Sequence, residues 1–276
     1  MYALEIYDSR AGENMIDEKF FSEFNVYDKT FTTRLKEVEC DTIYSEIERI
    51  LDKEKLYFKL TSVLQVCDEK NDVWAKLLGR IVLEGDMDAS RNAIEIVTRH
   101  VEYSEAALAA LLQKMEDYVT PSDEEKYKDD LSYLSEALAA FGEKSKAALP
   151  HLQSRLDNEY DIESGVSAAV AMVRIADGQN QAVEYLRTRL NDEETGYLAF
   201  TLESLFLAGP KLSVLEPEVK KCFINKDPEV FFYALKSWVY MNPEHKDKAR
   251  ELYLQRLSEG DIPKYLQRNS KKHFGV

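Results

Sequence analysis

Apolar residues recur along this chain with a period of about 34 residues. One column of apolar positions holds Leu156, Leu190, Phe223 and Leu257, and a second column holds Phe141, Ile175, Leu207 and Met241. Successive members of each column lie 32 to 34 residues apart. Each member of the first column is followed by a short turn rich in Asn, Asp or Gly, which tolerate left-handed backbone. Each repeat is therefore predicted to be a helix, a tight turn and a second helix.

Repeats of this length are typical of stacked helix pairs. We expect an all-α protein, a right-handed α-solenoid of stacked antiparallel helix pairs. Met115 and Leu83 extend the first column backwards, with an insertion at 119–125 that contains a capping box from Ser122 to Glu125. The pattern indicates five clear units from about residue 70 and one degenerate unit before them.

The two ends of the chain lack this period. Residues 1–40 are expected to form an irregular N-terminal cap, in which alternating residues could form short strands. These alternations are Leu4 and Ile6, and Phe31, Thr33 and Leu35. The solenoid would then span 41–261. Residues 262–276 form a basic tail, which is either frayed or packed on acidic neighbours.

Composition fits a folded helical protein, with 45% hydrophobic and 32% charged residues but only 10 Gly and 7 Pro among 276. The three cysteines have no paired spacing, which favours a reducing compartment. The first residues lack the basic and apolar regions of a signal peptide, and no stretch approaches the ~20 apolar residues of a membrane span. A cytoplasmic protein that does not bind membranes is expected.

The chain is strongly acidic. It has 36 Lys and Arg against 51 Asp and Glu, giving a net charge of −15. Nucleic acids and anionic membranes would be repelled on average, because basic groups supply most of the affinity for phosphates. A basic protein partner would be attracted. The alternative is that the acidity only maintains solubility.

Several segments resemble short HEAT-like repeats. Asp227-Pro228-Glu229-Val230 followed by Ala234-Leu235 looks like the family's turn and second helix, and Val166-Ser167-Ala168-Ala169 resembles the start of another. Pro150 and Pro217 each lie two residues before an apolar core position, as the proline of the family's first helix does. The resemblance covers roughly 70–260 and implies a HEAT-like (armadillo-type) solenoid.

The chain also departs from that family. The arginine that usually follows the valine is replaced by Ser167 and Phe231, and Arg91 is its nearest counterpart. The resemblance therefore does not extend to the family's Asp–Arg ladder. Tetratricopeptide repeats share the period, but their Trp, Gly and Tyr signature is missing from each unit.

No pattern of catalytic residues stands out. The four histidines lack the i, i+4 spacing or His-Glu pairs of a metal site, and no glycine-rich phosphate loop or nucleophile elbow occurs. Acidic pairs such as Asp129-Asp130 are ordinary for solvated helix faces. We therefore expect no cofactor, no metal and no enzymatic activity.

The predicted helix 229–240 carries aromatic residues on all sides. If Ala234, Trp238 and Met241 pack inward, Phe232 and Tyr240 would be partly exposed with Lys236 between them. Exposed aromatic residues often anchor protein interfaces. The alternative is that the segment 243–258 covers them.

In HEAT-like arrays the second helices line a concave groove, which implies a set of partner-binding residues here. They are Arg91, Glu95, Glu136, Glu163, Ser167, Glu194, Tyr197, Phe232, Lys236 and Tyr240. The leading hypothesis is a non-enzymatic protein-binding solenoid whose acidic groove binds a basic partner. Such a protein is similar to bacterial immunity proteins that neutralise a toxin domain. A bilin lyase or enzyme subunit of the HEAT-like class, and an assembly adaptor or scaffold, are the alternatives.

Overall fold

The computed structural model describes residues 18–25, 27–51, 57–117, 124–157, 161–192 and 195–276. In these ranges the regular structure is helical throughout and contains no strand, so the fold class is all-α as predicted. Within the same ranges, no helix combines the length and the apolar character needed to cross a bilayer. The chain divides into two compact units, Met1–Ala110 and Leu111–Val276.

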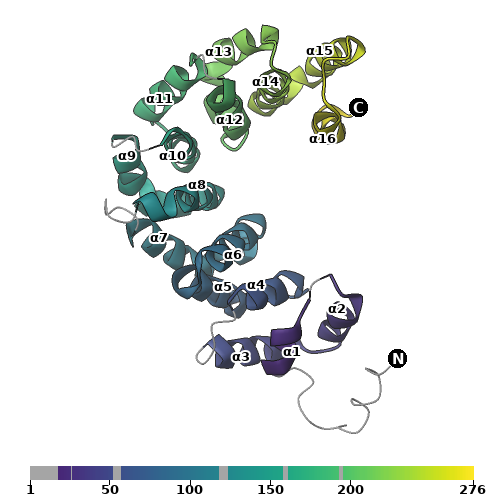
Figure 1. The fold of residues 1–276 in the computed structure, drawn as a ribbon. Helices are drawn as coiled ribbons and strands as arrows, with labels where there is room; N and C mark the ends of the chain where they lie inside the picture. Colours follow the sequence, from purple (N-terminus) through teal and green to yellow (C-terminus); the bar gives the residue numbers. More distant parts are fainter. Residues whose placement is uncertain (1–17, 26, 52–56, 118–123, 158–160, 193–194) are drawn as a thin grey trace. The chain divides into compact units, whose positions relative to one another are not determined.

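The first unit contains six helices that pack on one another (Figure 1). They are α1 (Glu18–Glu23), α2 (Lys29–Lys36), α3 (Cys40–Leu51), α4 (Tyr57–Val66), α5 (Asp72–Glu84) and α6 (Met87–Arg99), followed by the 3-10 helices η1 (Val101–Tyr103) and η2 (Glu105–Ala107). Trp74 is fully buried, and its indole N–H donates to the Leu64 carbonyl at 2.9 Å. The Asn92 amide donates to the Thr61 hydroxyl, 31 residues earlier, at 2.8 Å.

The strand considered for residues 31–35 is wrong, because these residues lie in helix α2. Asp28 caps this helix by accepting a bond from the Thr30 amide at 2.8 Å. Phe31 and Leu35 are four residues apart, so they share one helix face, and Leu35 is buried. A short alternation thus also fits helical spacing. The other alternation, Leu4 and Ile6, lies outside the described residues.

The second unit begins within α7 and continues through a longer series of helices (Figure 1). They are α7 (Leu108–Asp117), α8 (Glu124–Phe141), η3 (Gly142–Ala148), α9 (Leu149–Asp157), α10 (Ile162–Ile175), α11 (Asn180–Leu190), α12 (Thr195–Leu205), η4 (Gly209–Leu215), α13 (Glu216–Lys221), η5 (Cys222–Ile224), α14 (Pro228–Met241), η6 (Pro243–His245), α15 (Lys246–Ser258) and α16 (Lys264–Phe274).

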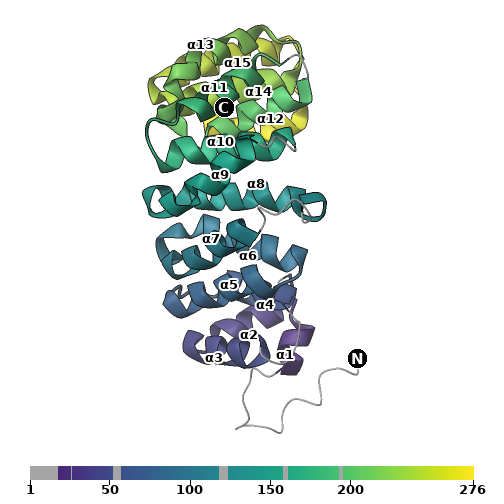
Figure 2. The same ribbon diagram turned by 90° about the vertical axis from the view of Figure 1, so that its left-hand side faces the viewer.

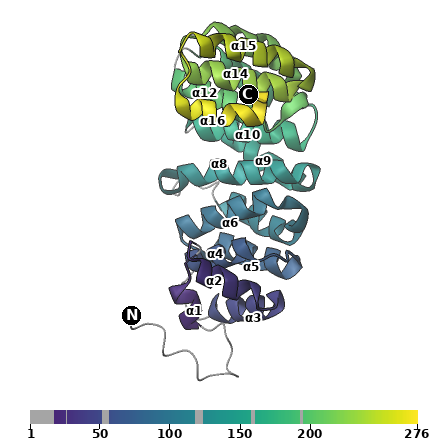
Figure 3. The same ribbon diagram turned by 90° about the vertical axis from the view of Figure 1, so that its right-hand side faces the viewer.

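Alternate helices of this unit form two layers. In one layer, α8, α10, α12, α14 and α16 each contact the next, and we refer to these five helices as the second-helix layer. Helices α9, α11, α13 and α15 pack against them from the other side. Figure 2 is viewed from the side of α9 and α11, and Figure 3 from the side of α15 and α16.

Helix α10 is packed on all sides. It contacts α8, α9, α11 and α12, and every residue from 164 to 173 is buried. A helix enclosed in this way must be apolar or small around its whole circumference. Ala168, Ala169 and Ala171 meet this requirement and let the neighbouring helices approach closely.

The first column of apolar residues occupies similar but not identical environments. Leu156 and Leu190 are buried in the last turns of α9 and α11. Phe223 lies in η5 and is half-buried, with its ring centroid 5.1 Å from that of Trp238. Leu257, near the end of α15, is also half-buried. All four lie at the ends of first helices, but only the first two belong fully to the core.

The second column of apolar residues also occupies similar but not identical environments. Phe141, Ile175 and Met241 are buried at the last residues of α8, α10 and α14. Leu207 is half-buried and lies two residues beyond the end of α12. Its carbonyl oxygen nevertheless has a defined role, because it accepts a hydrogen bond from Arg174.

Residues about one repeat apart contact each other across neighbouring helices of the second unit. The Arg174 guanidinium on α10 donates to the Leu207 carbonyl, 33 residues later, at 2.7 Å. The rings of Phe206 and Tyr240, 34 residues apart, have centroids 5.3 Å from each other. At these positions, residues one sequence period apart therefore contact each other.

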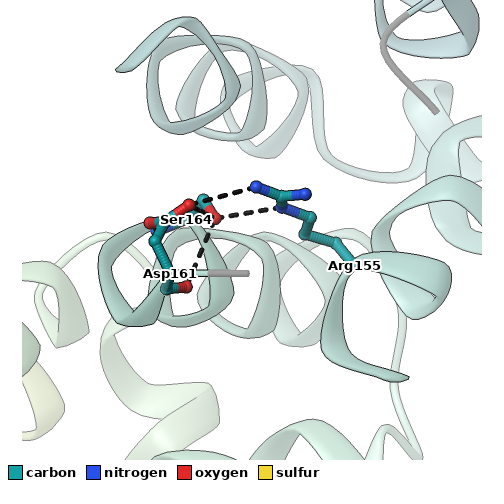
Figure 4. A network of polar contacts seen from close by, with 3 residues as sticks. All are labelled: Arg155, Asp161 and Ser164. Atoms are coloured by element: carbon teal, nitrogen blue, oxygen red, sulfur yellow. Dashed lines mark hydrogen bonds and ion pairs between the residues drawn. The ribbon is translucent and has the colours of Figure 1, made fainter. Parts of the chain in front are cut away.

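Arg155, near the end of α9, is bonded to the start of α10 (Figure 4). The Arg155 guanidinium donates to the Asp161 carboxylate and to the Ser164 hydroxyl, both at 3.0 Å. The side chain of Arg155 is only 9% exposed. Asp161 also caps α10 by accepting a bond from the Ser164 amide at 2.7 Å. The Asp161 carboxylate thus both caps α10 and pairs with the half-buried Arg155.

Arginines at the equivalent position bind turns elsewhere in the unit. Like Arg155, Arg189 and Arg256 each precede a member of the first column. Arg189 pairs with Asp192 in its own turn at 3.5 Å. Arg256 donates to the carbonyl of Lys226, in the preceding turn, at 2.7 Å. Charge-assisted bonds of this kind hold the turns against the helix ends.

A larger side chain at the centre of α10 should destabilise the second unit. Ala169→Leu is expected to lower the free energy of unfolding by about 1–3 kcal/mol, because helices surround this position and over-packing forces strain. Ala147→Leu, at an exposed position of η3, is the matched control and should change it by less than about 0.5 kcal/mol. Urea denaturation followed by circular dichroism measures both. Equal effects would contradict the enclosed position of α10.

Removing the Asp161 carboxylate should cost more than a helix cap alone. Asp161→Ala is expected to lower the free energy of unfolding by about 2–4 kcal/mol, since a cap contributes about 1 kcal/mol and Arg155 would be left without its carboxylate. Asp247→Ala, in the exposed first turn of α15, is the control. In the Arg155→Met background, Asp161→Ala should lower the free energy of unfolding by only about 1 kcal/mol, the contribution of the helix cap. An unchanged loss in that background would show that the two residues are not coupled.

Candidate partner-binding surface around Lys236

The predicted partner-binding residues fall in both units. Arg91 and Glu95 lie on α6 of the first unit, and both are half-buried. The Glu95 carboxylate pairs with Arg99 on the same helix at 2.5 Å. These two residues therefore do not form part of the surface described below, which belongs to the second unit alone.

In the second unit, four of the predicted residues are at least partly accessible. Glu163 on α10 is exposed, and Glu136 on α8, Tyr197 on α12 and Tyr240 on α14 are half-buried. All four belong to helices of the second-helix layer. Glu194 lies outside the described residues.

The exposure expected for three other residues is wrong. Ser167, Phe232 and Lys236 are only 3%, 1% and 7% exposed. Ser167 is buried because α10 is packed on all sides. Phe232 is covered by both α15 and α16, through ring contacts with Tyr253 and Phe274. Residues 262–276 were expected either to fray or to pack on acidic neighbours, and the structure has them packed as α16, with Tyr265 bonded to Glu229.

Lys236 is the one charged residue in the described part of the chain that is buried. Its ammonium lies 3.5 Å from the Glu203 carboxylate of α12. The same nitrogen lies 3.9 Å from the ring centroid of Phe206 and 5.5 Å from that of Tyr233. A carboxylate and two aromatic faces thus surround the cation, which is the environment that makes cation–π contacts favourable.

Charges from three helices act on Lys236. Burial lowers the pKa of its ammonium below the ordinary value, and Glu203 opposes this effect. Lys272 of α16 also lowers this pKa, whereas Glu136 of α8 raises it. The structure therefore places Glu136 near enough to act on Lys236, and both residues were predicted from the sequence to bind a partner.

His273 on α16 completes the cluster. Its Nδ1 lies 3.4 Å from the Tyr240 hydroxyl, and its ring packs against Tyr240 and Phe232. Burial, together with the nearby charges of Lys236 and Lys272, lowers the pKa of His273 to about 4. The imidazole is therefore neutral at physiological pH.

Glu203, Phe206, Tyr233 and His273 belong to this cluster but were not among the predicted site residues. For Glu203, Phe206 and His273, a signal was available in the period itself. Glu203 precedes Lys236 by 33 residues, and His273 follows Tyr240 by 33. Residues one period from a candidate were therefore candidates too. Predicting that they touch, however, requires the side-to-side packing of the helices.

Two of the three cysteines are poor nucleophiles. Cys67 and Cys222 are buried, and burial raises the pKa of the Cys67 thiol to about 12 and that of Cys222 to about 11. Among the described residues, no group of three His, Cys, Asp or Glu side chains could hold a metal ion. The groups gathered around Lys236 are aromatic rings and carboxylates, which suit binding of cationic side chains.

Comparison of the chain with protein-family models, with curated proteins and with solved structures finds no match.

Acidification should weaken the fold through His273. The folded pKa of about 4 lies below the ordinary 6.5, so the unfolded chain binds more protons between these values. The stabilising contribution is complete above about pH 6.5 and is lost as the pH falls toward about 4. Urea denaturation between pH 7.5 and 5 measures this slope. It should be smaller in His273→Gln, and an identical slope in both proteins would contradict the burial of a neutral imidazole.

Proposed function

We propose that the chain is a non-enzymatic, HEAT-like α-solenoid that binds a basic protein through its second-helix layer. The observation that carries this proposal is the layer itself. Successive helices α8 to α16 lie side by side, and residues one period apart contact each other. Arrays of this kind present an extended surface built from the same face of each repeat.

The chemistry of the layer supports a cationic ligand. Glu163 is exposed on α10, Glu136 is half-buried on α8, and the Glu203 side chain on α12 is also partly accessible. Partly accessible aromatic side chains, including Tyr197 and Tyr240, lie on the same helices. Lysine and arginine side chains of a partner can bind such carboxylates and aromatic faces.

The charge of the whole chain supports the same class of partner. A net charge of −15 attracts basic proteins over distances of about a Debye length and raises their association rate. Within this class, we favour a basic toxin domain that the chain would neutralise in a stoichiometric complex, as immunity proteins do. A single tight complex, rather than simultaneous binding of two partners, distinguishes this function from that of an adaptor.

Charge reversal in the second-helix layer tests the proposal. The partner is captured from cells of the source organism, purified, and its association with the full chain is followed by surface plasmon resonance. The association rate should fall about tenfold between 50 and 500 mM salt. Glu163→Lys should slow it at least about threefold, whereas Glu244→Lys, on exposed η6, should leave it nearly unchanged. An association rate that is insensitive to both salt and Glu163→Lys would refute this mode of binding.

A further inference from the structure

Helix α16 differs in charge from the rest of the chain. Residues 246–276 contain eight basic and four acidic side chains, whereas the preceding residues carry a formal charge of −19. Helix α16 itself has no acidic residue and exposes four basic side chains. These are Lys264, Arg268, Lys271 and Lys272. The chain thus ends in a basic amphipathic helix, which is the kind of ligand that its own acidic surface attracts.

This helix covers the aromatic residues of α14. Phe274 is buried, with its ring centroid 5.5 Å from that of Phe232 and 5.2 Å from that of Tyr253. One residue earlier, His273 packs against Phe232 and Tyr240. Phe232 and Tyr240 are two of the residues that the sequence places on a partner surface. Contacts from the last turn of α16 are therefore what separates them from solvent on this side.

The covered state has energetic costs. The Tyr253 hydroxyl is buried without a hydrogen-bond partner in the described structure, and an unsatisfied buried donor is unfavourable. The positive charges of Lys236 and Lys272 lie close enough to influence each other and His273. No side chain caps the start of α16 at Pro263, whereas Asp227 caps α14 with two bonds. These features favour release of α16 over release of α14.

We propose that α16 is a displaceable cover over α14, and that a basic amphipathic helix of the protein partner takes its place. This inference rests on the proposed binding of a basic protein and adds the class of segment that binds. The apolar residues of α16 define the pattern, since Leu266, Ser270 and Phe274 are buried at spacings of four. The partner helix would present small or apolar residues at i and i+4, an aromatic residue at i+8, and basic residues elsewhere.

Released α16 would also free a carboxylate. The Tyr265 hydroxyl of α16 donates to the Glu229 carboxylate at the start of α14, at 2.5 Å. After displacement, Glu229 could accept a bond from a basic residue of the incoming helix. The exchange therefore replaces a hydrogen bond between Tyr265 and Glu229 by an ion pair between the two proteins.

Hydrogen exchange of the full chain tests whether α16 opens by itself. Amides of 264–274 should exchange at least about 100-fold faster than those of 228–241, because local opening needs less free energy than opening of α14. Phe274→Ala should accelerate exchange in α16 at least about tenfold further and leave α12 unchanged. Lys271→Ala, on the exposed face of the same helix, is the control and should match the wild type. Equal protection of α16 and α14 in the wild type would overturn the proposal.

A peptide with the sequence of 262–276 serves as the probe for displacement. Its binding to the full chain is measured by fluorescence anisotropy. Phe274→Ala should bind the peptide at least about tenfold more tightly than the wild type or Lys271→Ala, because its own α16 no longer competes. Circular dichroism verifies that the variant remains folded. Affinity for Phe274→Ala no greater than for the wild type would refute competition at this site.

The captured partner separates this inference from the proposed function. A partner that binds Phe274→Ala at least about threefold more tightly than the wild type supports displacement of α16. Equal binding of the partner to both proteins overturns displacement but leaves the proposed function intact. If a basic protein binds neither protein, the proposed function fails, whatever the exchange of α16 shows.

Discussion

Lateral packing between successive second helices is the constraint on which the second unit depends. Helices α10, α12 and α14 each contact two neighbours in this layer as well as helices of the other layer. Helix α10 shows the consequence most clearly, because small residues such as Ala168 and Ala169 are the ones that fit where four helices converge. The rings of Phe206 and Tyr240, one period apart, make another lateral contact of this kind.

The polar groups of the unit follow from this packing. Where α9 and α10 pack together, Arg155 of α9 pairs with Asp161 at the start of α10. On the second-helix layer, carboxylates from α8 and α12 and the ammonium of Lys236 are brought close without being neighbours in sequence. The buried Lys236 ammonium thus lies between the Glu203 carboxylate and the rings of Phe206 and Tyr233.

The same packing explains why the last helix matters. The basic helix α16 packs on α14 and buries Phe274 against Phe232. The positive charge of α16 complements the acidic second-helix layer. In our proposal, a basic helix of the partner competes with α16 for the same position.

The sequence by itself determined the helical class, the turns and the period, because these depend on local spacing and on residues such as Asp227 and Pro228 that start a helix. It also identified Glu163 and Tyr240 as accessible positions. Only the tertiary structure decided that residues 31–35 are helical, that α16 covers Phe232, and that Lys236 is buried beside Glu203. Exposure depends on which distant segment packs against a helix, and no periodicity within one helix contains that information.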